Sequence, residues 1–546
     1  MNKVAVFGLD GATFEVIRRG CERGELPRLG RLLERGPYGT LESTVPAITA
    51  AAWTSFQTGV QPERHGIRDW LVRDEGSYRL RLVNSSMVKE RRLWDYAGEE
   101  GGRAVVVGLP VTFPPRPMNG LLVSGPLTSA AEGYTYPAGL ARELEAEVGK
   151  FPCFPEHWRG RYEWEDWLER LERSITLRER IARYLLEKGE WDLFVLHFME
   201  TDSVQHQMWH LYDQVERPKY RLRAKGDPIL RIYGAVDAAV GRLVDGLPPK
   251  TTVFLVSDHG FGPLYFDLNL NLWLLDKGYL SLKARPSSLL KRAAFRLGFT
   301  QEALFPWGER LRILGRGSEL RHDRLRDLLG TVFLSFDDID WRRTRAYSYG
   351  NVGQIFLNRR GREPQGIVEP RDVDRLVERL AGELGELLSP LDGKPVVERV
   401  VRKEQLSCGE AADRSPEILL VPRRGYMSLG ATDFPSNRVL TPTFAGSGWH
   451  EPSGILIGSG EALRAGEVNG ARLVDLLPTI LHAMDLTVPP GLDGQVLESL
   501  FAPAYLRDHA VRYGGPRDVD APPARETEGE DCDGVVRRRL RGLGYL

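Results

Sequence analysis

Short apolar runs that end in polar residues recur along this chain. The clearest is residues 252–256 (TVFLV), which stops at Ser257-Asp258-His259-Gly260. Continuous apolar runs of this length are typical of strands buried in a parallel sheet. We therefore predict buried strands at this run and at residues 3–9, 103–108, 120–125 and 191–198.

Helical periodicity separates these runs. Residues 14–35 carry leucines at helical spacing, and residues 158–189 form a long charged stretch with an apolar face. Alternation of strands and helices predicts an α/β fold, a doubly wound and mostly parallel sheet. Further helices are expected at residues 373–388 and 475–484, and further strands at 346–357 and 417–421.

The alternation is lost after Gly262. Residues 282–326 are basic and helical in pattern, with Pro286 and Pro306 as breakers, which indicates an inserted helical cap. The tail is rich in Pro, Asp, Glu and Arg before a short basic helix near residues 535–543. The predicted division is a core at 1–281, a cap at 282–345, the second part of the core at 346–501, and a charged C-terminal tail with a short helix at 502–546.

Composition narrows the class of protein. The 546 residues are 42% hydrophobic and 27% charged, and no apolar run approaches the length of a membrane span. Lys+Arg 74 against Asp+Glu 75 gives a net charge of -1, so nothing favours nucleic acid as a partner. The four cysteines lack CxxC spacing, and the apolar segment near Met1 is too short for a signal sequence. A cytoplasmic location is the expectation, and no oligomeric state is indicated.

Polar residues that could bind metal follow several of the predicted strands. Carboxyl ends of parallel strands meet at one edge of a sheet, where ligands bind. Asp202 and His206 are four residues apart, so a helix would place both on one face. Three carboxylates and three imidazoles suffice for two metal sites, an arrangement that suits phosphoryl transfer. The candidates are Asp10, Asp202, His206, Asp258, His259 and His450, the last on a loop ahead of a strand.

Thr49 is the candidate nucleophile. It stands at the N-cap of a helix expected over residues 50–58. Capping alone would explain a threonine at this position. A hydroxyl that attacks phosphorus must lose its proton near neutral pH, and direct metal coordination would bring this about.

Six motifs give the chain a resemblance to a known family. It resembles the alkaline phosphatase superfamily in its type I phosphodiesterase/nucleotide pyrophosphatase branch. The motifs are GLDG at 8–11, STVPAIT…AWTSFQTGVQPERHGI at 43–67, TDSVQH at 201–206, SDHGFGP at 257–263, WHEPSGILIGSG at 449–460 and VDLLPTILHAMDLTVPPGLDG at 474–494.

The resemblance implies roles for the candidate residues. Thr49 would be the nucleophile that becomes transiently phosphorylated. One metal would be held by Asp202, His206 and His450, and the other by Asp10, Asp258 and His259 with the Thr49 oxygen. The family usually carries zinc, and some relatives use manganese; this ligand set accepts both.

One departure from the family pattern concerns the substrate. Nucleotide pyrophosphatases place an Asn three residues after the nucleophile, where this chain has Ala52, and Trp53 follows where a His is usual. The phosphate would then be held by the metals and by backbone N–H groups at the helix start. The departure weakens the expectation of a nucleotide substrate more than that of the reaction class.

The resulting hypothesis is a metal-dependent hydrolase of a small-molecule phosphate ester, preferentially a diester, acting through phospho-threonine. A phosphomonoesterase of the same superfamily is the first alternative. A sulfatase would need a C/S-x-P-x-R motif, which does not occur, and the serine motif of phosphoglycerate mutase is not recognisable. The alternative of another class is a non-catalytic metal-binding regulatory protein on this fold. His65 is interpreted as structural, and Trp53 as a core residue or part of the substrate pocket.

Overall fold

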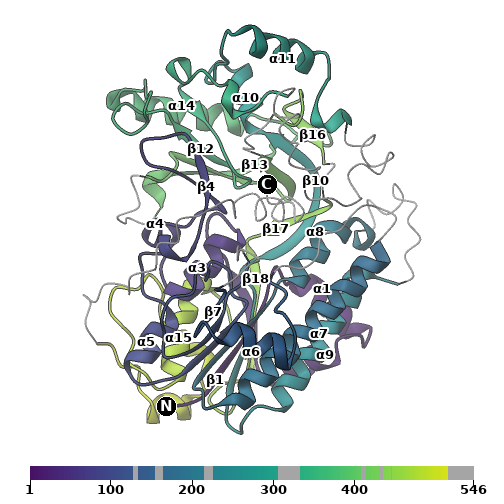
Figure 1. Ribbon diagram of the computed structural model, residues 1–546, viewed down its shortest axis with the longest axis vertical. Helices are drawn as coiled ribbons and strands as arrows, with labels where there is room; N and C mark the ends of the chain where they lie inside the picture. The colour runs from purple at the N-terminus through teal and green to yellow at the C-terminus, as the bar shows by residue number, and fades with distance from the viewer. Residues whose placement is uncertain are drawn as a thin grey trace.

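The computed structural model describes residues 1–126, 133–153, 164–213, 226–304, 333–406, 414–429, 434–443 and 446–514. The predictions for residues 158–163, for 305–326 of the cap and for the helix near 535–543 lie outside these residues. Figure 1 shows a larger lower part around a central sheet and a smaller upper part that carries α10, α11 and α14.

The central sheet is built around β1 (Val4–Leu9). It lies between β8 (Leu193–Phe198) and β9 (Thr252–Val256), and both pairings are parallel. Parallel pairing continues from β8 through β5 (Ala104–Val107) to β6 (Gly120–Val123). The antiparallel pairings join β7 (Thr135–Tyr136) to β6 at one edge, and β18 (Ser453–Ser459) to β9 and to β2 (Pro37–Glu42) towards the other. Short strands β19 (Gly466–Glu467) and β20 (Ala471–Arg472) pair in parallel with β2.

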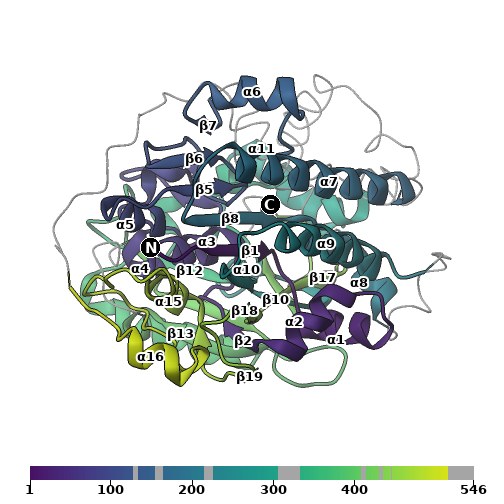
Figure 2. The same cartoon turned by 90° about the horizontal axis from the view of Figure 1, so that it is seen from below.

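Helices cover both faces of this sheet, as Figure 2 shows. Alternate residues of its strands point to opposite sides, so each face has apolar side chains to bury. Ala5, Phe7 and Leu9 of β1 belong to one hydrophobic core, and Val4 and Val6 belong to another. The first core includes α1 (Phe14–Glu22), α2 (Pro27–Arg35), α7 (Trp164–Lys188), α8 (Glu200–Tyr212) and α9 (Pro228–Asp245). The second includes α3 (Thr49–Thr58), α5 (Leu93–Glu99) and α15 (Leu476–Ala483). The predicted doubly wound, mostly parallel α/β fold is confirmed.

The upper part has its own hydrophobic core and two small sheets. Strand β10 (Gly260–Asn269) leads into it from β9 and pairs with β15 (Gly425–Leu429), β16 (Leu440–Pro442) and β17 (Gly448–Glu451). The other sheet has the order β11 (Ala346–Tyr347), β12 (Gln354–Leu357), β14 (Ile418–Pro422), β13 (Val397–Arg402). Its helices are α10 (Leu270–Asp276), α11 (Pro286–Arg296) and α14 (Val373–Gly385).

The strands between residues 346 and 422 therefore pair with one another, and β18 to β20 return to the central sheet. The division at residues 281, 345 and 501 stays a prediction. The remaining elements are α4 (Pro62–His65), β3 (Leu71–Arg73), β4 (Leu80–Leu82), α6 (Leu140–Glu147) and α16 (Pro503–Asp508). None of the helices in the described part of the chain has the length and apolar character needed to cross a bilayer.

Candidate active site

The candidate ligands meet at the carboxyl ends of the three central strands. Asp10 follows β1, and Asp258 and His259 follow β9. Helix α8 begins directly after β8 and carries Asp202 and His206. His450 comes from a distant part of the sequence, in β17, where it pairs with Phe261 of β10. The expected loop at His450 is thus a short strand, and its ladder with β10 brings His450 to the other ligands.

Asp202, His206 and His450 form one cluster. Oδ1 of Asp202 lies 3.4 Å from Nε2 of His206 and 3.4 Å from Nε2 of His450. The two Nε2 atoms are 3.1 Å apart. The helical spacing of Asp202 and His206 does place both on one face of α8, as predicted.

Asp10, Thr49, Asp258 and His259 form the second cluster. Nε2 of His259 lies 3.1 Å from Oδ2 of Asp258 and 3.6 Å from Oδ1 of Asp10. The Thr49 hydroxyl donates to Oδ1 of Asp10 at 3.4 Å and lies 3.2 Å from Nε2 of His259. The rings of His259 and His450 stack at 3.7 Å, so the clusters adjoin. The structure brings together all seven residues singled out in the sequence.

The three imidazoles turn the same nitrogen towards this centre. Nδ1 of His206, His259 and His450 lies 3.0 Å from the carbonyl oxygens of Gly448, Gly260 and Ala47, respectively. A carbonyl only accepts, so each Nδ1 carries a hydrogen, and each ring in its neutral form presents the lone pair of Nε2 to the centre. Backbone partners of this kind orient the histidines of metal sites.

Burial keeps two of these rings neutral. It lowers the pKa of His259 to about 4 and also lowers the pKa of His450. Neutral rings with hydrogen on Nδ1 cannot hydrogen-bond to each other through Nε2, yet the Nε2 atoms of His206 and His450 are in contact. A cation between these nitrogens would turn a repulsion of lone pairs into coordination.

Two of the three carboxylates, Asp10 and Asp258, lie in surroundings that disfavour their negative charge. Burial, followed by the charges of Asp258 and Asp202, raises the pKa of Asp10 well above its usual range. Burial raises the pKa of Asp258 to about 6. Oδ2 of Asp258 is buried and receives no hydrogen bond from the residues that the structure describes. The oxygen and nitrogen donors therefore fit divalent cations such as Zn²⁺ or Mn²⁺.

Thr49 is the first residue of α3, and Ile48 occupies the cap position. The prediction that Thr49 is the N-cap is therefore wrong by one residue, because the cap is Ile48. All residues of α3 are buried, so its N-terminal turn opens onto the ligand clusters rather than onto bulk solvent. The first turn of a helix presents backbone N–H groups and the positive end of the helix dipole, which favour an anion beside the hydroxyl.

Two residues that the sequence analysis did not assign to the site hold Asp10. Nε1 of Trp53 donates to Oδ2 of Asp10 at 3.0 Å, and Nε2 of His197 lies 2.8 Å from the same oxygen. A carboxylate accepts, so His197 is the donor in this contact. The signal for His197 in the sequence was a histidine inside an otherwise apolar strand, LFVLHF. Trp53 stands where the family usually has a His, but a tryptophan in a helix is usually a core residue, so this departure did not indicate a contact with Asp10.

His65 lies in a different hydrogen-bonded arrangement. Its Nδ1 accepts from the backbone N–H of Ile67 at 3.1 Å, which leaves Nε2 to donate to Oγ of Ser55 at 2.9 Å. These contacts tie the end of α4 to α3 and give His65 a structural role.

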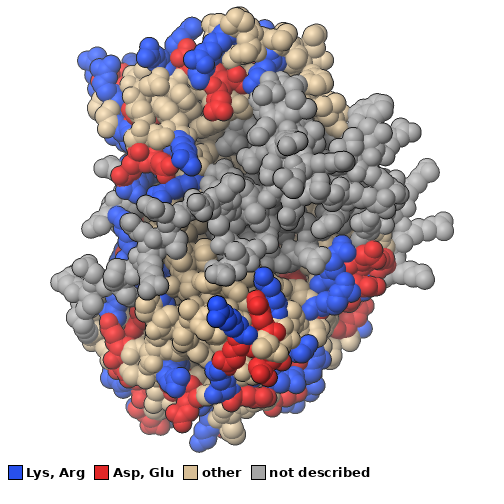
Figure 3. Space-filling model, viewed as in Figure 1, with Lys and Arg blue, Asp and Glu red and all other residues tan. Residues whose placement is uncertain are grey.

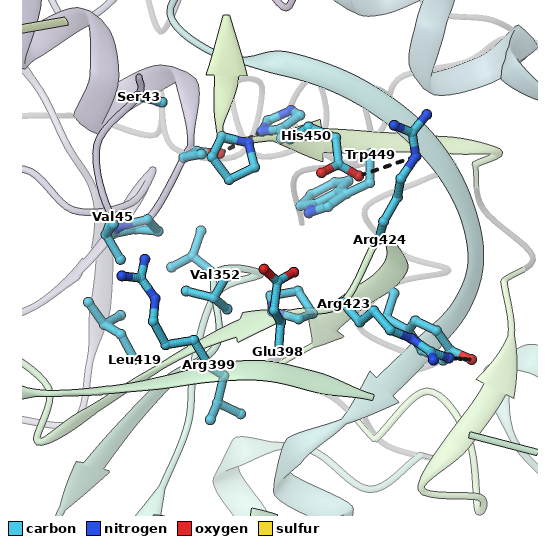
Figure 4. Close-up of a pocket in the computed structure, with 18 of the residues that line it drawn as sticks. Ser43, Val45, Val352, Glu398, Arg399, Leu419, Arg423, Arg424, Trp449 and His450 are labelled. Carbon is cyan, nitrogen blue, oxygen red and sulfur yellow. Dashed lines mark hydrogen bonds and ion pairs between the residues drawn. The ribbon is translucent and has the colours of Figure 1, made fainter. Parts of the chain in front are cut away.

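A pocket opens beside His450, between the core and the upper part (Figure 4). Trp449 stacks on His450 at 4.7 Å and forms part of its wall. Glu398 and Arg399 of β13 extend into the pocket from the opposite side. A group attached to a phosphate at the ligand clusters would have room here.

The fold and the site together define an alkaline phosphatase-like hydrolase. Residues 4–441 match the family model described as type I phosphodiesterase / nucleotide pyrophosphatase. No curated protein matches the chain. The chain belongs to the type I phosphodiesterase/nucleotide pyrophosphatase family of the alkaline phosphatase superfamily, and it is a hydrolase of phosphate esters.

One of two similar solved structures supports this architecture, at low sequence identity. Phosphonoacetate hydrolase from Sinorhizobium meliloti 1021, in complex with phosphonoformate, aligns with a TM-score of 0.53 at 15% identity, over 88% of this chain and 95% of that chain. Murine ectonucleotide pyrophosphatase / phosphodiesterase 5 aligns with a TM-score of 0.49 at 14% identity, over 92% of this chain and 100% of that chain. At such identities the first of these likenesses establishes the fold and nothing about the substrate.

Proposed function

We propose that the chain is a two-metal phosphodiesterase that acts through a phospho-threonine intermediate at Thr49. The observation that carries the proposal is the place of the Thr49 hydroxyl. It stands at the N-terminus of α3, 3.2 Å from Nε2 of His259 and 3.4 Å from Oδ1 of Asp10. A role in helix capping alone would not require the Thr49 hydroxyl to lie beside two candidate metal ligands.

The residues divide into two ligand sets. Asp202, His206 and His450 would hold one divalent ion, and Asp10, Asp258, His259 and the Thr49 oxygen would hold the other, with Zn²⁺ the first candidate and Mn²⁺ the second. When bound, these ions would neutralise phosphate charge and lower the pKa of oxygen nucleophiles.

The chain's own groups then account for the two chemical steps. Oγ1 of Thr49 loses its proton and forms a bond to phosphorus while the bond from phosphorus to the leaving oxygen breaks. That oxygen takes up a proton and leaves as the alcohol, and the remaining phosphoryl group stays on Thr49. In the second step water attacks the same phosphorus and the bond to Oγ1 breaks; one proton of the water restores the Thr49 hydroxyl, and a phosphate monoester is released. The N–H groups of the first turn of α3 support the negative charge of the phosphate in both steps.

A diester is the preferred substrate class, because the family model that the chain matches is described as type I phosphodiesterase / nucleotide pyrophosphatase. The pocket beside His450 leaves space for an organic group attached to the phosphate. Ala52 offers no side-chain amide to a phosphate oxygen. We therefore expect simple aryl phosphodiesters to be cleaved. Aryl phosphomonoesters are the alternative substrate class, and their rate of cleavage should be compared directly with that of the diesters. A metal-loaded protein that cleaved only sulfate esters would contradict the proposal.

The decisive experiment compares Thr49→Ala with Thr49→Ser and with Thr54→Ala. Thr54 is a buried threonine on the same helix, and its hydroxyl donates to the carbonyl of Ala50. Loss of the nucleophile should lower turnover by about 10³-fold or more, whereas Thr49→Ser should retain measurable activity. Thr54→Ala should lower the free energy of unfolding and leave turnover unchanged.

Metal content is measured in each variant, and acid quenching of the wild type with labelled substrate should trap label on Thr49. A metal-loaded Thr49→Ala protein with full turnover would show that the nucleophile lies elsewhere.

A further inference from the structure

Helix α11 (Pro286–Arg296) lies at the tip of the upper part, far from the central sheet (Figure 1). Its polar side faces the protein. Oγ of Ser288 donates to Oδ1 of Asp338 at 2.6 Å, and Nζ of Lys291 donates to Oδ2 of the same residue at 3.1 Å. Phe295 packs edge-on against Phe434. These contacts determine which face of the helix points outward.

The outward face is apolar. Leu289 is 50% exposed, Leu290 is 73% exposed, and Leu297, just after the helix, is 89% exposed. At 100° per residue these positions fall on one side of the helix, together with Ala293. Phe299 extends the apolar surface and stacks on Phe333. A surface helix normally buries such a face, so this one indicates a partner.

Positive charge surrounds the exposed leucines. Residues 283–299 contain no Asp or Glu, in a chain whose net charge is -1, and their basic residues other than the inward-facing Lys291 are Lys283, Arg285, Arg292 and Arg296. In Figure 3, Lys and Arg atoms lie beside uncharged residues at the upper end of the molecule, where some Asp and Glu atoms also lie. Exposed Leu and Phe flanked by Lys and Arg are the features with which an amphipathic helix binds a membrane surface.

We propose that α11 and residues 297–299 dock on an anionic lipid bilayer. The leucines enter the boundary between headgroups and acyl chains, and the basic side chains lie at the level of the lipid phosphates. A protein partner buried against leucines alone would not require basic side chains beside them. The docking surface is independent of the candidate active site and of the proposed reaction.

The test is co-sedimentation of the full chain with vesicles of phosphatidylglycerol and phosphatidylcholine, and with vesicles of phosphatidylcholine alone. Binding should require the anionic lipid and weaken as salt is raised. Leu290→Ser/Leu297→Ser should weaken binding by at least about tenfold, and Arg292→Gln/Arg296→Gln by about 10- to 30-fold. All variants should keep the far-UV circular dichroism spectrum and the melting temperature of the wild type, which shows that they are folded.

The matched control is Leu388→Ser/Leu391→Ser. These leucines are also exposed, at 54% and 63%, but lie outside the basic helix. Their replacement should leave vesicle binding unchanged. Equal binding by the wild type and the α11 variants would overturn the proposal. A wild-type dimer that Leu290→Ser/Leu297→Ser dissociates would also overturn it, because a second copy would then cover this face.

Discussion

Replacing Trp53 by Phe should separate the positioning of Asp10 from the packing of the core. Trp53 is fully buried, and its indole N–H donates to Oδ2 of Asp10 at 3.0 Å. Its ring lies so close to β1 that a Cβ at Gly8 would stand 2.5 Å from Cη2. Phenylalanine keeps an aromatic ring in this space and removes the donor. The His197 contact to the same oxygen remains.

These contacts determine the size of the expected losses in stability and in metal affinity. Losing a buried hydrogen bond to a carboxylate costs about 1.5–3 kcal/mol, and the smaller ring leaves a void that adds to the loss. The effect on the site is separate from stability, because Asp10 is a candidate ligand and its Oδ2 loses one of the two groups that hold it. Removing such a group typically weakens metal binding by about 10- to 100-fold.

The assay measures two quantities for each variant, the free energy of unfolding in urea and the metal affinity in a chelator competition. The control is Phe56→Leu, because Phe56 packs edge-on against Trp53 at 5.4 Å and has no group that could hydrogen-bond to a ligand. We expect Phe56→Leu to lose stability at unchanged metal affinity, and Trp53→Phe to lose both. Wild-type metal affinity in a destabilised Trp53→Phe protein would refute the role of Trp53 in orienting Asp10.

Two further predictions concern the metals and the pocket. Elemental analysis should find about two divalent ions per chain, and chelation should abolish turnover until Zn²⁺ or Mn²⁺ is restored; activity that is indifferent to chelator would contradict the two-metal proposal. Arg399→Gln should change KM for diesters that differ only in the leaving alcohol and leave metal content unchanged, since Arg399 extends into the pocket beside His450. Arg402→Gln, at the end of the same strand, is the control and should change neither.

The sequence was most informative where local pattern and chemistry coincided. An apolar run that ends in Asp-His marks a strand end, and the strand ends of a parallel sheet meet. Asp10, Asp202 and Asp258 could therefore be expected at one edge before any pairing was known. The four-residue spacing of Asp202 and His206 likewise predicted that both lie on one face of a helix, because the face on which a residue lies depends on helix geometry alone.

The sequence was less informative where a position depends on long-range pairing. His450 reaches the site because β17 pairs with β10, and the sequence near residue 450 does not indicate that pairing. His197 contacts Asp10 from the neighbouring strand β8, and Trp53 contacts it from α3. Their roles depend on the register of β8 against β1 and on the position of α3 against the sheet. Strands at 346–422 have ordinary strand character, so their sequence could not indicate which sheet they join.

Strand β10 explains how ligands so far apart in the chain keep a common geometry. Its first residues pair with β17 beside His450, and the carbonyl of Gly260 accepts from Nδ1 of His259. The same strand continues into the upper part and pairs there with β15. Gly260 permits this path, because a Cβ there would lie 2.1 Å from the carbonyl oxygen of Ser453. The stacked imidazoles are thus held by a continuous hydrogen-bonded ladder rather than by a loop. One strand therefore links the upper part, which supplies Glu398 and Arg399 to the pocket, with the proposed metal ligands.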